Sequence, residues 1–244
     1  MSDKMIGIQL YTVRGECQKD FKGTLRALAE MGYRGVEFAG NYGGMSPADL
    51  AAFLHSLGLS AAGMHVSVED ILNFRSDAYA YARALNNTFL TTSLPGEVKK
   101  DWPATVDRLV QAAATAYANG FVFTYHNHSE EAVASGGVTA LDQALARVSI
   151  LQFELDTYWL TKGGQNPAAF IRRYTGRAPQ IHLKDMDPAD SSFAEVGRGS
   201  LDMPGIVAAA RAAGARWLIV EQDTCKRPSL ESARISIEAL QRIG

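Results

Sequence analysis

Cysteine is scarce in this sequence. Its 244 residues include two cysteines, Cys17 and Cys225, which lie far apart in the chain. A secreted scaffold that depends on disulfides needs more cysteines in a shorter chain, whereas these two could form one bridge at most. The usage fits a reducing compartment better, so we expect a cytoplasmic protein.

Long apolar runs are missing as well. The N-terminal apolar run ends before Arg14 and Glu16, which makes it too short for the core of a signal peptide. No stretch approaches the ~20 apolar residues of a membrane span. Positive charge is not in excess either, because the formal net charge is −2. We therefore expect neither a membrane nor a nucleic acid as a partner.

The glycine-rich turns of nucleotide-binding folds are absent too, because the first apolar segment runs into QLYTVRGE without GxGxxG or a phosphate loop. What the chain contains instead is an alternation of short apolar runs, typical of buried parallel strands, with longer Ala- and Leu-rich segments of helical period. This pattern predicts an α/β protein with a single (β/α)8 TIM barrel over residues 1–244, rather than an open doubly wound sheet. The predicted strands are Met5–Thr12, Gly35–Ala39, Ala61–Val66, Thr88–Thr92, Gly120–Asn127, Leu151–Asp156, Gln180–Lys184 and Trp217–Glu221.

Polar side chains gather where the last four predicted strands end. In a TIM barrel the active site lies at these C-terminal ends, and side chains along a strand alternate in direction. The residues that share a direction are Glu154 with Asp156, His182 with Lys184, and Thr124 with His126 and His128. An inward set of His, Asp and Glu suits Mn²⁺, Co²⁺, Zn²⁺ or Mg²⁺ with positions left open for substrate. The alternative is a network of ion pairs and hydrogen bonds without a metal, since buried carboxylates and imidazoles need partners in any case.

Motifs spread along nearly the whole chain carry a family resemblance. In chain order they are GIQLYTVR, GYRGVEF, YHNH, LDTYW, IHLKDMD and VGRGSLDMPG. Together they resemble the xylose-isomerase-like barrel superfamily, and more narrowly its sugar-phosphate isomerase/epimerase group. That resemblance implies one divalent metal ion (Mn, Mg, Co or Zn) held by side chains from strands five to eight.

The resemblance implies metal ligands at three strand ends, namely Asp156, His182 and Glu221. In the epimerases of this group two metal-bound glutamates face opposite sides of the sugar and exchange a proton with it, while the metal polarises the neighbouring oxygens. Glu221 is the glutamate that this chain retains, so we expect it to be catalytic.

The fifth strand departs from the family pattern. Where many isomerases have a glutamate, this strand offers Thr124, with His126 and His128 further along the same face. We expect His126 as the fourth ligand, with His128 and Glu154 as alternatives. Because one glutamate is missing, a second catalytic group has to come from a histidine, His126 first, or from Lys184.

Further residues are predicted to contact the substrate. Glu37 and His65 are candidates for hydrogen bonds to sugar hydroxyls, although His65 could equally be a packing residue. Trp159 could form an apolar wall against a sugar ring or cap the barrel core. Arg198 could bind a phosphate or carboxylate, or face solvent. The predicted substrate-binding set is Glu37, His65, His128, Glu154, Lys184, Trp159 and Arg198.

The sequence leaves several functions open. The leading hypothesis is a metal-dependent isomerase or epimerase whose small-molecule carbohydrate substrate is a keto sugar or related polyol. The same metal could serve an elimination, as in a dehydratase or an enzyme that cleaves a 3-keto-glycoside, because elimination needs one base and one acid. A third hypothesis is a non-catalytic sugar-binding barrel, and a metal-dependent endonuclease is disfavoured by the five histidines and the negative net charge. The oligomeric state is open, a homo-oligomer included.

Overall fold

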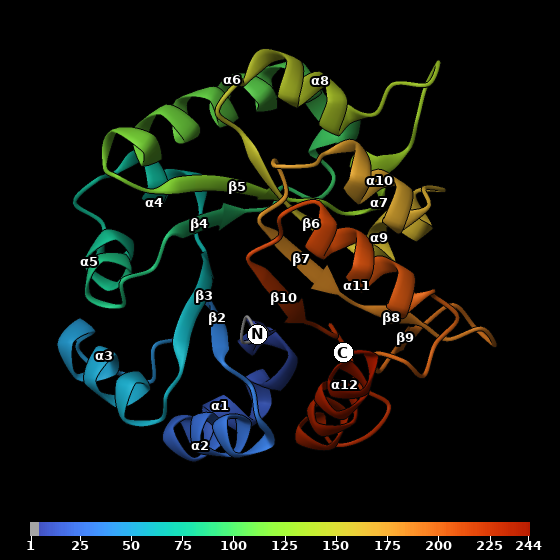
Figure 1. Ribbon diagram of the computed structural model, residues 1–244. Coiled ribbons are helices and arrows are strands. Elements are labelled where there is room, and N and C mark those ends of the chain that lie inside the picture. Colours follow the sequence, from blue (N-terminus) through green and yellow to red (C-terminus); the bar gives the residue numbers. More distant parts are fainter. Residues whose placement is uncertain (1–4) are drawn as a thin grey trace.

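The computed structural model describes residues 5–244, in which eight parallel strands close into a barrel. Each barrel strand pairs with its neighbours in chain order, and β10 closes the ring against β1. Figure 1 shows the helices on the outside of this ring. The predicted (β/α)8 barrel is confirmed. Its strands are β1 Ile6–Gln9, β2 Gly35–Ala39, β3 Ser60–His65, β4 Phe89–Thr92, β5 Val122–His126, β6 Gln152–Asp156, β7 Gln180–Leu183 and β10 Trp217–Val220.

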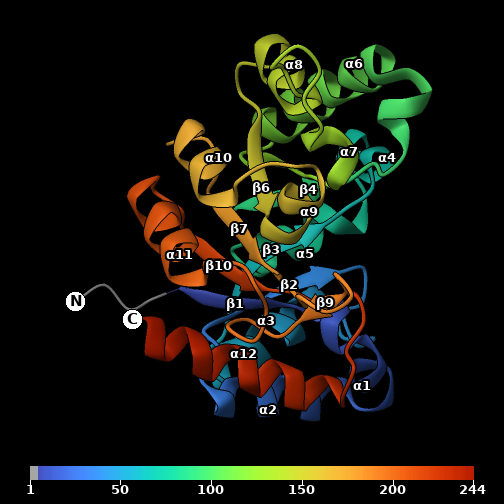
Figure 2. The ribbon, with the colours of Figure 1, turned by 90° about the vertical axis from the view of Figure 1, so that its right-hand side faces the viewer.

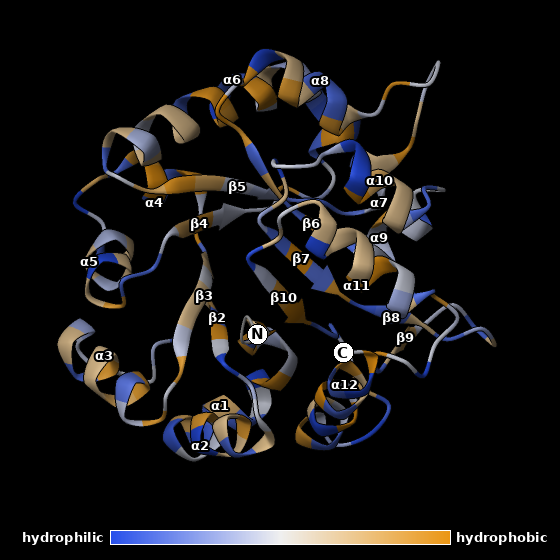
Figure 3. Cartoon of the chain, in the orientation of Figure 1, coloured by the Kyte–Doolittle hydropathy of each residue, from blue (hydrophilic) through white to orange (hydrophobic). Residues whose placement is uncertain are grey.

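The outer helices are amphipathic. In α2, Leu25 and Leu28 are fully buried, whereas Arg26 and Glu30 on the same helix are exposed. Figure 3 shows this mixture of orange and blue along the outer helices, and Figure 2 shows α12 running beside α2. The helices are α1 Arg14–Lys19, α2 Phe21–Met31, α3 Pro47–Ser56, α4 Val68–Leu72, α5 Asp77–Ala84, α6 Glu97–Ala118, α7 Ser129–Ala132, α8 Ala140–Arg147, α9 Thr157–Lys162, α10 Pro167–Arg173, α11 Met203–Ala212 and α12 Ser229–Ile243.

The first strand is shorter than the prediction of Met5–Thr12. Residues Leu10–Val13 form a 3-10 helix, η1. The side chain of Gln9 accepts a hydrogen bond from the backbone N–H of Tyr11, 3.1 Å away, and so caps this turn directly after the strand. An apolar run alone does not distinguish the end of a buried strand from a buried turn.

The interior of the barrel changes from apolar to polar along its axis. Trp217, Phe89 and Ile219 pack together at the end where the strands begin. The next layer is a buried ladder in which Thr124 donates to Gln180 at 2.9 Å and Gln180 donates to Glu37 at 3.1 Å. Because buried polar groups cost free energy unless they are paired, this ladder stabilises a polar interior and leads directly to the polar strand ends.

One glycine makes room for the ladder. A Cβ atom on Gly63 would lie 2.3 Å from both the Gln180 Nε2 and the Glu37 Oε1 atoms. Any larger residue on this part of β3 would therefore displace the amide and the carboxyl group that meet there. Gly63 thus lets two long polar side chains meet inside the barrel.

A short hairpin follows β7 and was not predicted. It consists of β8 Asp185–Met186 and β9 Phe193–Ala194, which pair in antiparallel orientation. The carboxylate of Asp185 accepts hydrogen bonds from the backbone N–H groups of Gly197, Gly199 and Leu201, at 3.0–3.1 Å. A Cβ atom on Gly199 would lie 2.2 Å from Asp185 Oδ1. Glycine at this position of the VGRGS segment therefore lets the loop backbone approach the Asp185 carboxylate.

Within residues 5–244, no helix combines the length and the apolar character that crossing a membrane requires. The cysteines Cys17 and Cys225 are both free thiols. No disulfide therefore links η1 and α1 to the loop that precedes α12.

Candidate active site

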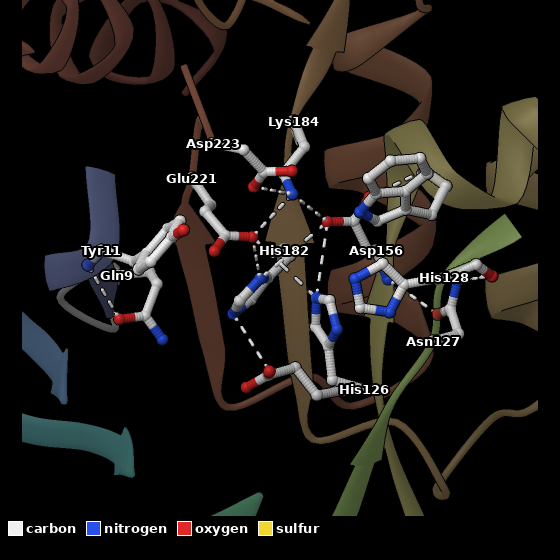
Figure 4. A network of polar contacts seen from close by, with 12 residues as sticks. Gln9, Tyr11, His126, Asn127, His128, Asp156, His182, Lys184, Glu221 and Asp223 are labelled. Carbon is white, nitrogen blue, oxygen red and sulfur yellow. Dashed lines mark hydrogen bonds and ion pairs between the residues drawn. The ribbon is translucent and has the colours of Figure 1, made fainter. Parts of the chain in front are cut away.

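His182 stands at the centre of the candidate site, fully buried on β7. Its Nδ1 atom lies 2.9 Å from Oε2 of Glu221, and its Nε2 atom lies 2.7 Å from Oε2 of Glu37. Figure 4 shows the His182 ring beside Glu221. Because Glu221 follows the end of β10 and Glu37 lies within β2, the two nitrogens face different groups of carboxylates at different depths in the barrel.

The shallower group, here called the ligand group, consists of His126, Asp156, His182 and Glu221. Each offers one ligand atom, and these atoms all lie within 4.8 Å of one another. His126 Nε2 lies 3.5 Å from Asp156 Oδ2, and His182 Nδ1 lies 4.0 Å from the same oxygen. Metal bonds of about 2.0–2.2 Å place neighbouring ligand atoms roughly 3–3.5 Å apart, so these separations leave room for one divalent ion.

The hydrogen bonding of His126 also fits a metal site. Both of its ring nitrogens are buried and have no hydrogen-bond partner among the described residues. Leaving an imidazole in this condition costs free energy unless a ligand compensates it. The donor set of two imidazoles and two carboxylates is one that Zn²⁺, Mn²⁺ or Co²⁺ accepts.

The second group, here called the supporting group, consists of Glu37 and Glu154, which are fully buried, and of His65, which is half-buried. His65 Nε2 lies 2.6 Å from Glu154 Oε2, and His182 Nε2 lies 3.1 Å from the same oxygen. Together with His182 these residues could also be viewed as a metal cluster. However, separations of 2.6 and 2.7 Å are hydrogen-bond lengths and are too short for two ligands of one ion. We therefore interpret the supporting group as hydrogen-bond partners that fix the His182 ring, a common arrangement behind metal-binding histidines.

The two carboxyl groups behind His182 differ in charge. Burial, and next the neighbouring Glu154, raises the pKa of Glu37 to about 8, so Glu37 is mostly neutral at pH 7. Burial acts in the same direction on Glu154, but His182 and His65 outweigh it and hold the pKa of Glu154 well below its ordinary value. The supporting group therefore contributes one carboxylate and one carboxylic acid.

Lys184 places a buried ammonium group beside the ligand group. Its Nζ atom lies 2.8 Å from Glu221 Oε2, 3.1 Å from Asp156 Oδ2 and 2.9 Å from Asp223 Oδ1. Burial alone would lower the pKa of Lys184, but these three carboxylates outweigh it and raise the pKa above its ordinary value. Lys184 is therefore protonated, which suits a source of positive charge and does not favour a role as a base.

A cavity of about 300 Å³, here called the catalytic cavity, opens over this network. Its walls include the side chains of Lys184 and Glu221 from one side of the barrel and those of His126 and His128 from another. Figure 4 shows Glu221 and the two histidines on opposite sides of His182. A volume of this size accepts a small molecule such as one sugar ring.

The fifth strand contributes histidines to the cavity and no carboxylate. Thr124 lies in the buried ladder, where its hydroxyl is 2.8 Å from that of Thr91. His126 reaches the ligand group, and the ring of His128 packs against it with 5.2 Å between centroids. Burial, and next His126, lowers the pKa of His128 to about 3, so this ring is neutral.

Two residues that were predicted to contact the substrate, Trp159 and Arg198, do not line the catalytic cavity. Trp159 is half-buried, and its ring lies 5.5 Å from Lys184 Nζ and 5.1 Å from the His128 ring. It packs behind these two residues and does not line the catalytic cavity. Arg198 is exposed on the loop before α11 and has no ion pair with any described residue, so the structure does not bring it to the site.

The prediction did not name Gln9 and Asp223 as site residues, although both line the catalytic cavity. Gln9 Nε2 donates to Glu37 Oε2 at 2.9 Å, and Asp223 pairs with Lys184. Asp223 follows Glu221 by two positions in VEQD, so the alternation of side chains along a strand predicts that both point in the same direction. That signal could have identified Asp223. Gln9 carries no comparable signal, since a lone glutamine after an apolar run is common.

Comparisons with known proteins agree with this fold. Residues 25–243 match the family model described as xylose isomerase-like TIM barrel. A crystal structure of a sugar phosphate isomerase/epimerase from Parabacteroides distasonis superposes with a TM-score of 0.80 at 22% identity, covering 99% of this chain and 94% of that one. The IOLI protein, solved with a bound zinc atom, superposes with a TM-score of 0.76 at 12% identity over 98% of this chain and 97% of that one.

A curated relative is similar over a shorter segment. An inosose dehydratase from Clostridium beijerinckii is 26% identical over 88 residues, which is 36% of this chain and 30% of that protein. The match to the family model covers nearly the whole barrel, from α2 to the end of α12. The chain belongs to the xylose isomerase-like TIM-barrel family.

Proposed function

We propose that this chain is a metal-dependent sugar isomerase that moves a proton between two neighbouring carbons of a keto sugar or related polyol. The observation that carries the proposal is the position of Glu221. Its Oε2 atom faces His182 and Lys184, while its Oε1 atom makes no hydrogen bond or ion pair with a described residue and the side chain lines the catalytic cavity. One carboxylate thus serves both the ligand group and the substrate side.

The ligand group fits one divalent ion, as its spacing and the unpartnered nitrogens of His126 indicate. Such an ion polarises a carbonyl and the neighbouring hydroxyl, which makes the hydrogen on the adjoining carbon more acidic. The family neighbour with a bound zinc atom supports a metal in this fold. Manganese, magnesium, cobalt and zinc all remain candidates for this chain.

Glu221 is the proposed base. Burial opposes its ionisation, but Lys184 and His182 outweigh burial and hold the pKa of Glu221 well below its ordinary value. The ionised carboxylate takes the proton from the carbon that bears the hydroxyl and returns it to the former carbonyl carbon. The hydroxyl proton passes to the carbonyl oxygen, so the step is balanced without an oxidant or a reductant.

Lys184 supplies charge during this transfer. Its ammonium group is fixed by Glu221, Asp156 and Asp223 and needs no rearrangement when negative charge develops on the substrate oxygens. Preorganised positive charge in a buried site lowers the energy of such a transition state. Lys184 therefore assists as a fixed cation, while Glu221 moves the proton.

Among the described residues, the carboxylates that line the catalytic cavity are Glu221 and Asp223, and both pair with Lys184 and lie away from the side of the histidines. The fifth strand presents Thr124, His126 and His128 where an epimerase of this family would have another glutamate, so this strand offers no second carboxylate. Epimerisation requires a proton to leave one side of the sugar and return to the other. Isomerisation can use one base on one side, so the geometry favours it.

Elimination is the second candidate, because it also begins with removal of one proton next to a carbonyl. Glu221 would remove that proton from the carbon next to the carbonyl and would then return it to the oxygen that leaves from the following carbon. The similarity to an inosose dehydratase over 88 residues supports keeping this candidate. The two reactions share the first step and differ in whether a bond to oxygen breaks.

The test is incubation of metal-loaded protein with keto sugars and keto polyols in D₂O. Isomerisation places deuterium next to the carbonyl and moves the carbonyl to the neighbouring carbon, which nuclear magnetic resonance detects. Elimination releases water or an alcohol and gives an unsaturated ketone. If the protein, loaded with each of the four metals, gives neither deuterium incorporation nor product, the proposal is wrong. Glu221→Gln should abolish whichever reaction is found.

A further inference from the structure

A second cavity lies beside the catalytic cavity. It measures about 540 Å³, and the catalytic cavity measures about 300 Å³. His65 lines both cavities, and the consecutive residues Ala39 and Gly40 line one each. The two spaces are therefore neighbours across the ends of β2 and β3, and one molecule could extend through both.

The walls of the second cavity come from loops at the catalytic face. Tyr42 belongs to the loop after β2, and residues 66–78 follow the end of β3. These βα loops build the substrate site in barrels of this kind. The larger cavity is thus on the face where substrate enters, and none of the residues in the ligand group lines it.

Tyr42 forms a rigid aromatic wall. Its ring stacks on that of Tyr81, with 3.8 Å between centroids and 10° between planes. The Tyr81 hydroxyl donates to the backbone oxygen of Met45 at 2.6 Å, which fixes the pair. Tyr42 lines the cavity, and an aromatic side chain held in this way can pack against the C–H groups of a sugar ring.

Polar groups around Tyr42 are available for hydrogen bonds. The Tyr42 hydroxyl, the Asn73 amide nitrogen and the Asp77 carboxylate have no hydrogen-bond partner among the described residues, and all three side chains line the cavity. Burial, and next Tyr81, Asp70 and Asp77, raises the pKa of Tyr42 to about 12, so its hydroxyl remains a donor. A donor, an amide and a carboxylate at an aromatic face match the alternating donors and acceptors of sugar hydroxyls.

The charges favour a neutral group over a phosphate. Asp70 and Asp77 line the cavity, and Arg75 is the cationic side chain that balances them in part. An anion would meet a net negative wall, whereas a carboxylate accepts hydrogen bonds from sugar hydroxyls at little cost.

We propose that the second cavity binds a second sugar unit linked to the sugar that reacts. This inference rests on the proposed function for the identity of the reacting ring. The substrate is then a keto-glycoside of at least two units, with its keto ring against Glu221 and its second ring on Tyr42. A free or phosphorylated monosaccharide would leave this cavity unused.

The test compares a 3-keto-disaccharide with the matching 3-keto methyl glycoside, which lacks the second ring. The variants are Tyr42→Phe and Asp77→Asn. Tyr117→Phe is the matched control, because Tyr117 is 71% exposed on α6. Glu238→Gln on α12 is the control for the loss of one exposed negative charge. Two readouts are taken, kcat/KM in the metal-loaded enzyme and equilibrium binding of the corresponding unoxidised sugars by calorimetry.

The wild type should favour the two-ring compound by at least tenfold in both readouts. Each cavity variant should reduce this preference by about threefold to tenfold, the usual effect of one hydrogen bond, while both controls keep it. Equal values for the two compounds, a preference for a phosphorylated monosaccharide, or an unchanged preference in both cavity variants would overturn the inference. Absence of turnover with tighter binding of the disaccharide would refute the proposed reaction and leave the second subsite supported.

Discussion

His182 Nδ1 lies 2.9 Å from Glu221 Oε2, although the two residues are 39 positions apart in the chain. The contact follows from the barrel, because β7 and β10 are neighbours and Leu183 pairs with Val220, the residue before Glu221. The opposite side of the ring is held by Glu37. The orientation of the central histidine is therefore set by the fold before any ligand arrives.

Lys184→Met should show whether the charge of Lys184 assists the reaction without contributing to metal binding. We expect kcat to fall about 100-fold, because the buried cation beside Glu221 is lost, while metal content stays at the wild-type level or rises. Lys226→Met is the control, since Lys226 also pairs with two carboxylates, Asp187 and Asp190, but on an exposed loop. Steady-state kinetics and elemental analysis check this prediction. Loss of the metal in Lys184→Met would show that Lys184 organises the ligands.

The two carboxyl groups behind His182 should respond differently to amide substitution. Glu37 is mostly neutral at pH 7, so Glu37→Gln keeps its charge and should lower the free energy of unfolding by about 1–3 kcal/mol, because the new amide nitrogen cannot accept the hydrogen bond of Gln9 or of Gln180. Glu154 is ionised between His65 and His182, so Glu154→Gln should cost about 3–5 kcal/mol. Urea unfolding of the metal-free proteins measures both values. Equal losses would contradict the assigned charges.

The histidines of the fifth strand should differ in metal affinity. His126→Gln should weaken binding at least about tenfold, because His126 Nε2 faces Asp156 and Glu221. His128→Gln should leave the affinity nearly unchanged, since its ring packs against His126 at the cavity wall. Competition with a chelator measures both constants, and each variant is the control for the other. The reverse order would make His128 the fourth ligand.

Asp142 should make stability depend on acid pH. Burial works against its charge, but hydrogen bonds from Tyr174 and Thr139 and the charge of Arg173 outweigh burial and lower the pKa of Asp142. A lowered pKa in the folded state stabilises the protein above about pH 4, the unfolded pKa, and the effect is lost as pH falls through the folded pKa. Asp142→Asn should cost about 1 kcal/mol at pH 7 and progressively less below pH 4. Thermal unfolding from pH 7 to pH 3 tests this, and a pH-independent difference would refute it.

Much of the barrel could be predicted from the sequence, because each β/α unit repeats one local pattern. The alternation of side chains also placed Glu154 with Asp156, and His182 with Lys184, on the inner face of the barrel. The hairpin after β7 was missed because its strands have two residues each, too few for a periodic signal. The end of β1 was missed because its turn is as apolar as the strand.

The depth of a residue along the barrel axis is what the sequence could not reveal. Glu37 and Glu154 were predicted to contact substrate, but both are fully buried behind His182. Their role depends on distances across the barrel, from β2 and β6 to β7, that no local pattern encodes. The second cavity could not be predicted for the same reason, because its walls come from the segment after β2 and the segment after β3, and their separation in space is not encoded in either one.

The most direct test of the account is the number of metal ions bound per chain and the side chains that hold them. Metal-free protein is titrated with Mn²⁺, Co²⁺, Zn²⁺ and Mg²⁺ in a calorimeter, together with Asp156→Ala and the exposed control Asp190→Ala. The account predicts one ion per chain in the wild type and in the control, and at least a 100-fold weaker affinity in Asp156→Ala. No binding in the wild type, two ions per chain, or an unchanged affinity in Asp156→Ala would contradict it.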